Sequence, residues 1–145
     1  MTVDGILKRK GRGVITIERD TPVGAALCIM RHKNVGAVVV SQTGREVEGL
    51  VGERDLIRAL KSHGVGRLMT TTVADIMNRD VAACRPEEDL RRVMTRMAAR
   101  RVHHMPVVND NGICGMVSMA DVVKQRLIEA EADAAMLRDR VTVPV

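Results

Sequence analysis

The chain repeats itself, and no other feature of the sequence constrains its fold as strongly. Residues 14–40 align with residues 81–107 at a constant shift of 67 positions, and apolar residues fall on apolar residues. The alignment then continues at a shift of 66, so that Asp55 falls on Asp121. A fixed period of this kind is typical of repeat architectures. The sequence therefore predicts two copies of one structural unit.

Each copy is predicted to fold as β-α-β-β-α. In the first copy we expect an extended segment at 14–17, a helix from residue 23, strands at 37–40 and 49–51, and a helix at 54–62. In the second copy we expect an extended segment at 81–84, a helix from residue 90, strands at 105–108 and 113–117, and a helix from residue 120. The helices follow from apolar residues at i, i+3, i+4 and i+7, and the strands flank turn-rich loops. One copy alone buries too little surface to be stable, so the two copies are expected to share an interface.

The repeat divides the chain into three parts. We expect the first repeat at 1–66, the second repeat at 67–126 and a C-terminal helical extension at 127–145. A linker is predicted at 64–71, where glycines accumulate. A capping box at Thr72-Val-Ala-Asp75 is then expected to open a short helix that reaches Met77.

A copy of this short helix begins the chain. Residues 2–7 match residues 72–77 at a shift of 70, so the first repeat carries three extra residues before Gly11. They fall within the basic run Lys8-Arg9-Lys10. This run is either a solvated basic face or a source of cations for a ligand that carries phosphate.

The last helix carries an apolar stripe at alternating spacings of three and four residues. Its members are Leu127, Ala130, Ala134, Leu137 and Val141. Charged residues lie between them, a pattern typical of heptad repeats, although the stripe is too short to establish a coiled coil. Two interpretations stay open: the helix packs on its own domain, or it contacts a second subunit.

Composition excludes several kinds of binding site. Of the 145 residues, 46% are hydrophobic and 28% are charged, which is enough apolar material for a folded core. The chain contains no Phe, Tyr or Trp. Base-stacking platforms for single-stranded nucleic acid and cages for quaternary ammonium groups both rely on aromatic rings, so we expect neither.

Charge and hydropathy favour a cytoplasmic protein with a mild preference for anionic partners. The net charge is +5, which makes a nucleic-acid-binding basic module the alternative function. Because 18 acidic residues are interspersed among the 23 basic ones, nucleic acid is not the expected partner. No apolar run is long enough to span a bilayer, and the first ten residues lack the apolar core of a signal peptide. The three cysteines, Cys28, Cys84 and Cys114, are expected to be buried reduced thiols.

The tandem units resemble a pair of CBS domains, the motif named after cystathionine β-synthase. The segments that carry the resemblance are Val35-Gly-Ala-Val38, Gly49-Leu-Val-Gly-Glu-Arg-Asp55, Val102-His-His-Met-Pro106 and Gly115-Met-Val-Ser-Met-Ala-Asp121. The resemblance implies an α+β fold in which two tandem β-α-β-β-α CBS repeats pack around a pseudo-two-fold axis, here with an extended C-terminal helix. It also implies two clefts between the repeats, often occupied by adenosyl ligands such as AMP, ADP, ATP, NAD(H) or S-adenosylmethionine.

In this family an Asp near the start of each second helix holds the ribose of the ligand. A carboxylate accepts hydrogen bonds from both ribose hydroxyls, and a Ser or Thr three residues earlier sits at a helix N-terminus that favours phosphate. The second repeat keeps both residues, as Ser118 and Asp121, whereas the first repeat keeps Asp55 but has Gly52 in place of the Ser or Thr. We therefore expect the main ligand in the Asp121 cleft. The alternative is that Ser118 and Asp121 form only a capping box.

The resemblance assigns residues to both clefts. The main cleft is expected to comprise Lys10, Gly13, Ile15, Val35, Gly36, Ala37, Ser118, Met119 and Asp121. The second cleft is expected to comprise Gly52, Arg54, Asp55, Met77, Ala82, Val102 and His104. No metal site is expected, because neighbouring histidines on a strand point to opposite faces, with one in the cleft wall and one outside it.

The resemblance implies a non-catalytic sensor of adenine nucleotides. AMP, ATP or NAD(H) in the clefts would change the angle between repeats or subunits, and a regulated protein partner that the sequence does not identify would read the change. A homodimer through the helices of the CBS pair is also implied. We do not expect an enzyme, because the sequence has no Gly-rich phosphate loop, no G-x-S-x-G motif and no metal-binding cluster.

Overall fold

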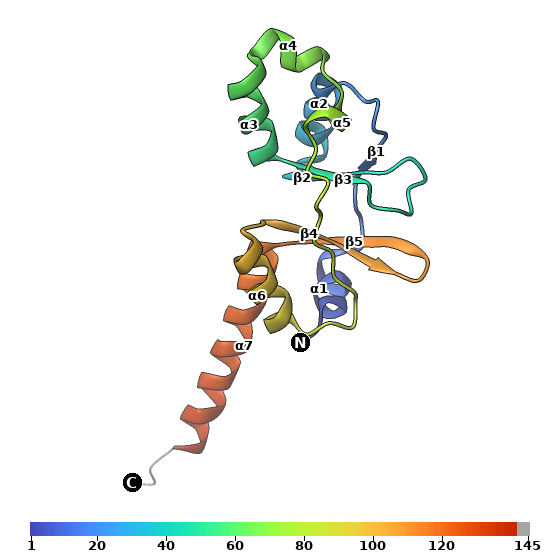
Figure 1. The fold of residues 1–145 in the computed structure, drawn as a ribbon. Helices are drawn as coiled ribbons and strands as arrows, with labels where there is room; N and C mark the ends of the chain where they lie inside the picture. Colours follow the sequence, from blue (N-terminus) through green and yellow to red (C-terminus); the bar gives the residue numbers. More distant parts are fainter. Residues whose placement is uncertain (142–145) are drawn as a thin grey trace.

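The computed structural model describes residues 1–141. The strands in this part of the chain form two sheets that face each other in the middle of the molecule (Figure 1). The first sheet has the order β1-β2-β3 and comprises β1 (Thr16–Ile17), β2 (Ala37–Val40) and β3 (Gly49–Gly52). Strand β1 pairs with β2 in parallel, and β2 pairs with β3 in antiparallel fashion. The second sheet is the antiparallel pair of β4 (His104–Asn109) and β5 (Gly112–Ser118).

Helices cover the outer face of each sheet (Figure 1). On the first sheet lie α2 (Val23–Lys33), α3 (Glu53–His63) and α5 (Val73–Ile76), and α4 (Val65–Thr70) packs on α2 and α3 farther from the sheet. On the second sheet lie α1 (Val3–Lys10), α6 (Leu90–Arg100) and the first turns of α7 (Met119–Arg140). The predicted α+β class, with two similar repeats and a long C-terminal helix, is confirmed.

The two sheets bury one apolar interface between them. Its buried members are Ala37, Val39, Leu50 and Met116. Because side chains alternate along a strand, Val38 and Val40 point instead into the core between the first sheet and its own helices. Strand β2 is therefore buried on both faces, which explains its uninterrupted run of valines.

The short helices α1 and α5 are exchanged between the repeats. Ile6 and Leu7 of α1 are fully buried in the hydrophobic cluster of the second repeat, which also contains Leu90. Val73 of α5 is fully buried in the corresponding cluster of the first repeat. The chain therefore crosses between the two halves after each short helix, and this crossing ties the halves together.

Two local predictions are wrong. Residues 64–71 are not a linker, because residues 65–70 form helix α4, and burial of Leu68 against the first core stabilises this helix despite its glycines. The extended segments are also shorter than expected. Strand β1 has only two residues, and the second copy contributes only an isolated bridge between Cys84 and Val107. The valines that begin the two predicted segments, Val14 and Val81, pack instead in the interface between the sheets.

The predicted capping box and the predicted thiol burial also need correction. Helix α5 forms, but the Thr72 hydroxyl donates to Asp75 Oδ2 at 3.2 Å instead of accepting from a backbone N–H. All three cysteines are free; Cys84 is buried and Cys114 is half-buried, but Cys28 is exposed because it lies off the face of α2 that packs on the core. Burial raises the pKa of Cys84 to about 12, so this thiol stays protonated.

Helix α7 extends well beyond the rest of the molecule (Figure 1). Its buried residues, Val122 and Gln125, both lie in its first two turns. The members of the predicted stripe are all exposed, with Leu127 at 58% and Leu137 at 61%. The interpretation that this stripe packs on its own domain is therefore wrong, and residues 142–145 of the predicted extension lie outside the described residues.

Candidate functional site

The end of β5 and the start of α7 place Ser118 and Asp121 in a reciprocal capping box. The Ser118 N–H donates to Asp121 Oδ2 at 2.9 Å, and the Asp121 N–H donates to Ser118 Oγ at 3.1 Å. These bonds satisfy an N–H group that the helix start leaves without an intrahelical partner. The two residues of the family motif thus have a structural role that requires no ligand.

The ammonium of Lys10, at the end of α1, lies on the same carboxylate. Its Nζ donates to Asp121 Oδ2 at 2.6 Å and to the carbonyl oxygen of Met116 at 3.0 Å. The exchange of α1 explains this contact, because α1 packs on the second sheet and its basic end therefore reaches the start of α7. The rest of the basic run bonds elsewhere, since Lys8 pairs with Asp4 and Arg9 donates to Gln125.

This ion pair sets the electrostatics of Asp121. Burial raises the pKa of Asp121, but hydrogen bonds from Lys10 and Ser118 outweigh burial, so its pKa lies below the ordinary value. The carboxylate is ionised at neutral pH, and the Lys10 ammonium compensates its charge. A ligand at this position must therefore compete with Lys10 for the carboxylate or offer the ammonium an anion.

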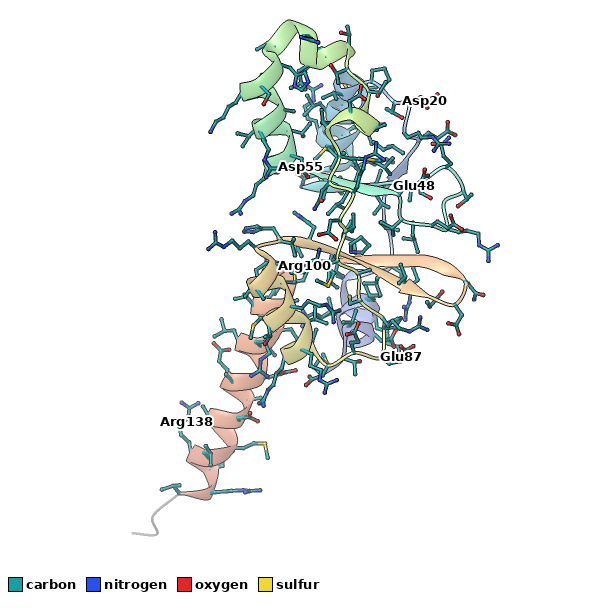
Figure 2. The ribbon with its side chains drawn as sticks, in the orientation of Figure 1. Asp20, Glu48, Asp55, Glu87, Arg100 and Arg138 are labelled. Carbon is teal, nitrogen blue, oxygen red and sulfur yellow. The ribbon has the colours of Figure 1, made fainter. Side chains whose placement is uncertain are left out.

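A cleft of about 490 Å³ opens between the repeats at Asp55. It is lined by Leu50, Gly52, Glu53, Arg54, Asp55, Arg58, Asn78, Arg100, Arg101, Val102, His103 and His104. Asp55, at the start of α3, and Arg100, at the end of α6, lie on opposite sides of the space between the two halves (Figure 2). The lining holds four arginines but two carboxylates, and the volume is in the range of small-molecule sites.

Asp55 is less compensated than Asp121. Its Oδ2 accepts the Gly52 N–H at 2.8 Å, which matches the bond from Ser118 to Asp121 in the other repeat. Its Oδ1 lies 3.6 Å from Arg58 Nη1, and the Arg58 side chain is 76% exposed, so this ion pair is loosely held. The Asp55 carboxylate can therefore accept hydrogen bonds from a ligand without displacing a tightly bound cation.

His104 lies at the start of β4, next to both clefts. It lines the Asp55 cleft and packs on Gly36, where a Cβ atom would come within 3.1 Å of His104 Nε2. Burial lowers the pKa of His104, so the imidazole is neutral at pH 7. His103 lines the same cleft, contrary to the expectation that one histidine lies outside it, because β4 begins only at His104 and strand alternation does not reach His103.

Several residues assigned to the clefts from the sequence lie in hydrophobic clusters. Met77 is buried in the core of the first repeat, and Ala82 is buried in the core of the second. The apolar residues assigned to the Asp121 cleft pack as follows: Ile15 and Val35 against the first core, Met119 against the second core and Ala37 between the sheets. Gly13 is exposed.

Sequence reasoning missed three arginines of the Asp55 cleft. Arg58 lies one helical turn after Arg54, so the shared helix face could have indicated it. Arg100 and Arg101 directly precede Val102, which was assigned to the cleft, so adjacency could have indicated them too. No sequence signal marks Asn78, which reaches the cleft through its backbone bridge to Leu50.

Within residues 1–141, no group of three or more His, Cys, Asp or Glu side chains is placed to hold a metal ion. In the same part of the chain, no helix has both the length and the apolarity that crossing a bilayer requires.

Comparison with known proteins identifies both repeats. The profile of the CBS domain matches residues 10–62 and 73–127. The CBS domain-containing protein CBSX3, mitochondrial, of Arabidopsis thaliana is 34% identical over 131 residues, which cover 85% of this chain and 63% of that protein. The chain therefore spans less than two thirds of this relative's length.

Solved structures agree with the profile. The crystal structure of the CBS-domain containing protein ATU1752 from Agrobacterium tumefaciens is 33% identical, with a TM-score of 0.82 over 87% of this chain and 99% of that chain. The match covers nearly all of that chain, which is named for its CBS domains, and so agrees with the expectation that these 145 residues are not an enzyme. The CBS domain pair of protein MJ0100, solved in complex with 5′-methylthioadenosine and S-adenosyl-L-methionine, shares the fold at 22% identity and a TM-score of 0.75, covering 90% of this chain and 98% of that one.

Proposed function

The chain belongs to the CBS-domain family as a pair of CBS domains, and we propose that it is a regulatory module that binds an adenine nucleotide between its repeats. The observation that carries the proposal is the Asp55 cleft, where both repeats contribute to a lining with four arginines and the Asp55 carboxylate. A carboxylate suits the ribose hydroxyls, and guanidinium groups suit phosphates, which they bind through two parallel hydrogen bonds. AMP, ATP and NAD(H) carry both groups.

We rank the Asp55 cleft ahead of the Asp121 cleft for a phosphorylated ligand. Lys10 lies 2.6 Å from the Asp121 carboxylate, whereas the Arg58 guanidinium lies 3.6 Å from Asp55. A ribose that binds Asp121 must compete with the Lys10 ammonium for the carboxylate unless the ligand also offers that ammonium an anion, whereas a ribose that binds Asp55 meets no tightly held cation. This ranking is the reverse of the one that the sequence motif favours, because Ser118 adds a hydroxyl only to the Asp121 site.

The adenosyl part of the proposal has support from the MJ0100 pair, a protein of the same fold that was solved with two adenosyl compounds. The phosphate part rests on this chain's own arginines. A cytoplasmic location stays a prediction, since the Arabidopsis relative is named as mitochondrial. The regulated protein partner also stays a prediction.

A ligand in this cleft would connect the two repeats. The start of α3 supplies Asp55 from the first repeat, and the end of α6 supplies Arg100 and Arg101 from the second. A nucleotide held by residues of both repeats would favour one angle between the two halves, and a partner protein would respond to that angle. The ligand shifts this equilibrium only by its difference in affinity for the two arrangements.

Thermal unfolding and calorimetry with AMP, ATP, NAD(H), adenosine and S-adenosylmethionine test the proposal on the full chain. A ligand at about 100 times its dissociation constant stabilises the fold by about 2.7 kcal/mol, which raises the melting temperature by several degrees. We expect Asp55→Ala to abolish the shift and Asp121→Ala to reduce it only weakly. Equal binding by Asp55→Ala and the parent contradicts the choice of cleft.

The arginines are tested by comparing ATP with adenosine. We expect Arg100→Gln to weaken ATP binding at least tenfold and to leave adenosine binding unchanged, because charge-assisted bonds to phosphate are lost. Arg91→Gln is the matched control, since Arg91 is an exposed arginine of the same helix that does not line the cleft. If only oligonucleotides bind, with an affinity that falls steeply with salt, the basic-module alternative is correct instead.

A further inference from the structure

The two repeats differ at the end of the short exchanged helix. Helix α5 has four residues, and the chain after it reaches the edge of the first sheet at Asn78. There the Leu50 N–H donates to the carbonyl oxygen of Asn78 at 3.0 Å, and the Asn78 N–H donates to that of Leu50 at 2.9 Å. Helix α1 has eight residues. The three extra residues before Gly11 therefore lengthen this helix by about one turn.

At the equivalent place in the second repeat, a side chain makes the contact with the sheet. Met116 is the residue of the second sheet that aligns with Leu50. Its carbonyl oxygen accepts from Lys10 Nζ at 3.0 Å, and the same ammonium donates to Asp121 Oδ2 at 2.6 Å. The added turn of α1 thus brings a cation to the carboxylate that the family motif assigns to the ribose.

The packing of α1 holds Lys10 in this place. Ile6 and Leu7, about one turn earlier, are fully buried in the core of the second repeat. Arg9 donates to Gln125 of α7, which is 4% exposed, and this contact fixes the last turn of α1 against α7. The helix dipole also favours a cation at the C-terminal end of α1. The fold as well as the ion pair therefore keeps the ammonium at the site.

We propose that Lys10 is an intramolecular occupant of the Asp121 site, which leaves Asp55 as the open member of this pair of carboxylates. A neutral nucleoside at Asp121 would have to displace an ammonium whose side chain is only 35% exposed, and would leave that cation without its partner. Asp55 imposes no such cost, because the Arg58 side chain is 76% exposed and lies 3.6 Å away. The class of ligand is that of the proposed function, on which the proposal rests; the new element is the residue that sets the number of open sites.

Calorimetry of the full chain with adenosine tests the proposal, because adenosine carries no anion that could satisfy the ammonium. In an Asp55→Ala background, which removes the open site, we expect Lys10→Ala to raise the affinity for adenosine at least about tenfold. With Asp55 intact, the same substitution should raise the stoichiometry from one adenosine per chain to two. Lys8→Ala is the matched control, since Lys8 lies on the same helix but pairs with Asp4, and it should change neither quantity.

A third substitution assigns the gained binding to its site. Asp121→Ala, added to Asp55→Ala and Lys10→Ala, should abolish it. If Asp55→Ala binds adenosine equally with and without Lys10→Ala, or if Asp121→Ala leaves the gained binding intact, the proposal is overturned. The proposed function fails on a different comparison, namely equal binding by the parent and by Asp55→Ala with Lys10 in place.

Discussion

The side chain of Leu7 lies on the backbone of Gly115, where a Cβ atom would come within 2.8 Å of Leu7 Cδ2. Met77 has the same relationship to Gly49, where a Cβ atom would come within 2.7 Å of Met77 Cγ. The internal repeat aligns Leu7 with Met77 and Gly49 with Gly115. Each glycine therefore makes room for a side chain from the exchanged short helix, and the repeat conserves both sides of this contact within one chain.

This packing predicts that Gly115→Ala destabilises the fold. Leu7 is fully buried, so it cannot move aside without disturbing its neighbours in the second core. Overpacking of this kind costs about 1–3 kcal/mol. Chemical denaturation should therefore show a free energy of unfolding that is lower by about this amount, although alanine is the better residue for backbone entropy.

Gly66→Ala is the matched control for this prediction. Gly66 is exposed in α4, and a Cβ atom there would have nothing within 4 Å. The substitution should raise the free energy of unfolding by up to about 1 kcal/mol, because alanine favours a helix over glycine. Equal effects of the two substitutions would show that the contact with Leu7 does not restrict residue 115.

The C-caps of α2 and α6 predict a stabilising substitution. Asn34 and Arg101 are equivalent in the repeat, and both adopt the left-handed conformation, with φ of 53° and 54°. Asn tolerates this conformation, whereas other side chains lose roughly 1–2 kcal/mol in it. Arg101→Asn should therefore raise the free energy of unfolding by about 1 kcal/mol, and Arg101→Ala should give no such gain. Similar stabilities of the two variants would contradict strain at residue 101.

The same position links stability to the proposed function. Arg101 lines the Asp55 cleft, so an arginine at a site that favours Asn trades stability for positive charge in the cleft. Under the proposed function, Arg101→Asn should be more stable than the parent and should bind ATP more weakly. A variant that gains stability and keeps full affinity for ATP would remove Arg101 from the phosphate site.

Repeated apolar spacing was sufficient to predict the order of helices and strands in each repeat, because the same pattern occurs twice and one copy checks the other, whereas the packing of the two repeats was implied by the resemblance to CBS domains. The arginines of the Asp55 cleft were not predictable in the same way. Arg58 and Arg100 lie on helices of different repeats, and only the packing of the two sheets brings them to one cleft. The stripe of α7 shows the converse limit, since apolar spacing predicts a helix face equally well whether a core or a second chain covers it.

The ion pair between Lys10 and Asp121 predicts a pH-dependent contribution to stability. The pKa of Asp121 is below its ordinary value in the folded chain, so the contribution is complete above the unfolded pKa of about 3.9 and is lost as the pH falls through the folded pKa. Lys10→Gln should lower the free energy of unfolding at pH 7 by about 1 kcal/mol, a modest value because both side chains are partly exposed. The difference from the parent should shrink below pH 4.

Lys8→Gln is the control for this pair. Lys8 also pairs with an aspartate, Asp4, at 3.2 Å, but its side chain is 71% exposed. Exposed ion pairs contribute little, so denaturation at pH 7 should show a smaller loss than for Lys10→Gln. A loss for Lys10→Gln that persists unchanged at pH 3 would show that the carboxylate of Asp121 is not the partner that matters.

Burial of His104 predicts a second pH dependence, in a higher range. Burial holds the pKa of His104 below its ordinary value; Glu53 and Asp121 oppose this shift, and His103 and Lys10 reinforce it. The unfolded chain therefore binds a proton at this residue first, near pH 6.5, so stability is complete above pH 6.5 and is lost as the pH falls through the folded pKa. In melting curves between pH 8 and pH 5, His104→Gln should lose less stability on acidification than the parent does. His32→Gln, at an exposed position of α2, should follow the parent. If the melting temperature falls with pH equally for the parent and for His104→Gln, the folded chain protonates His104 as readily as the unfolded chain does.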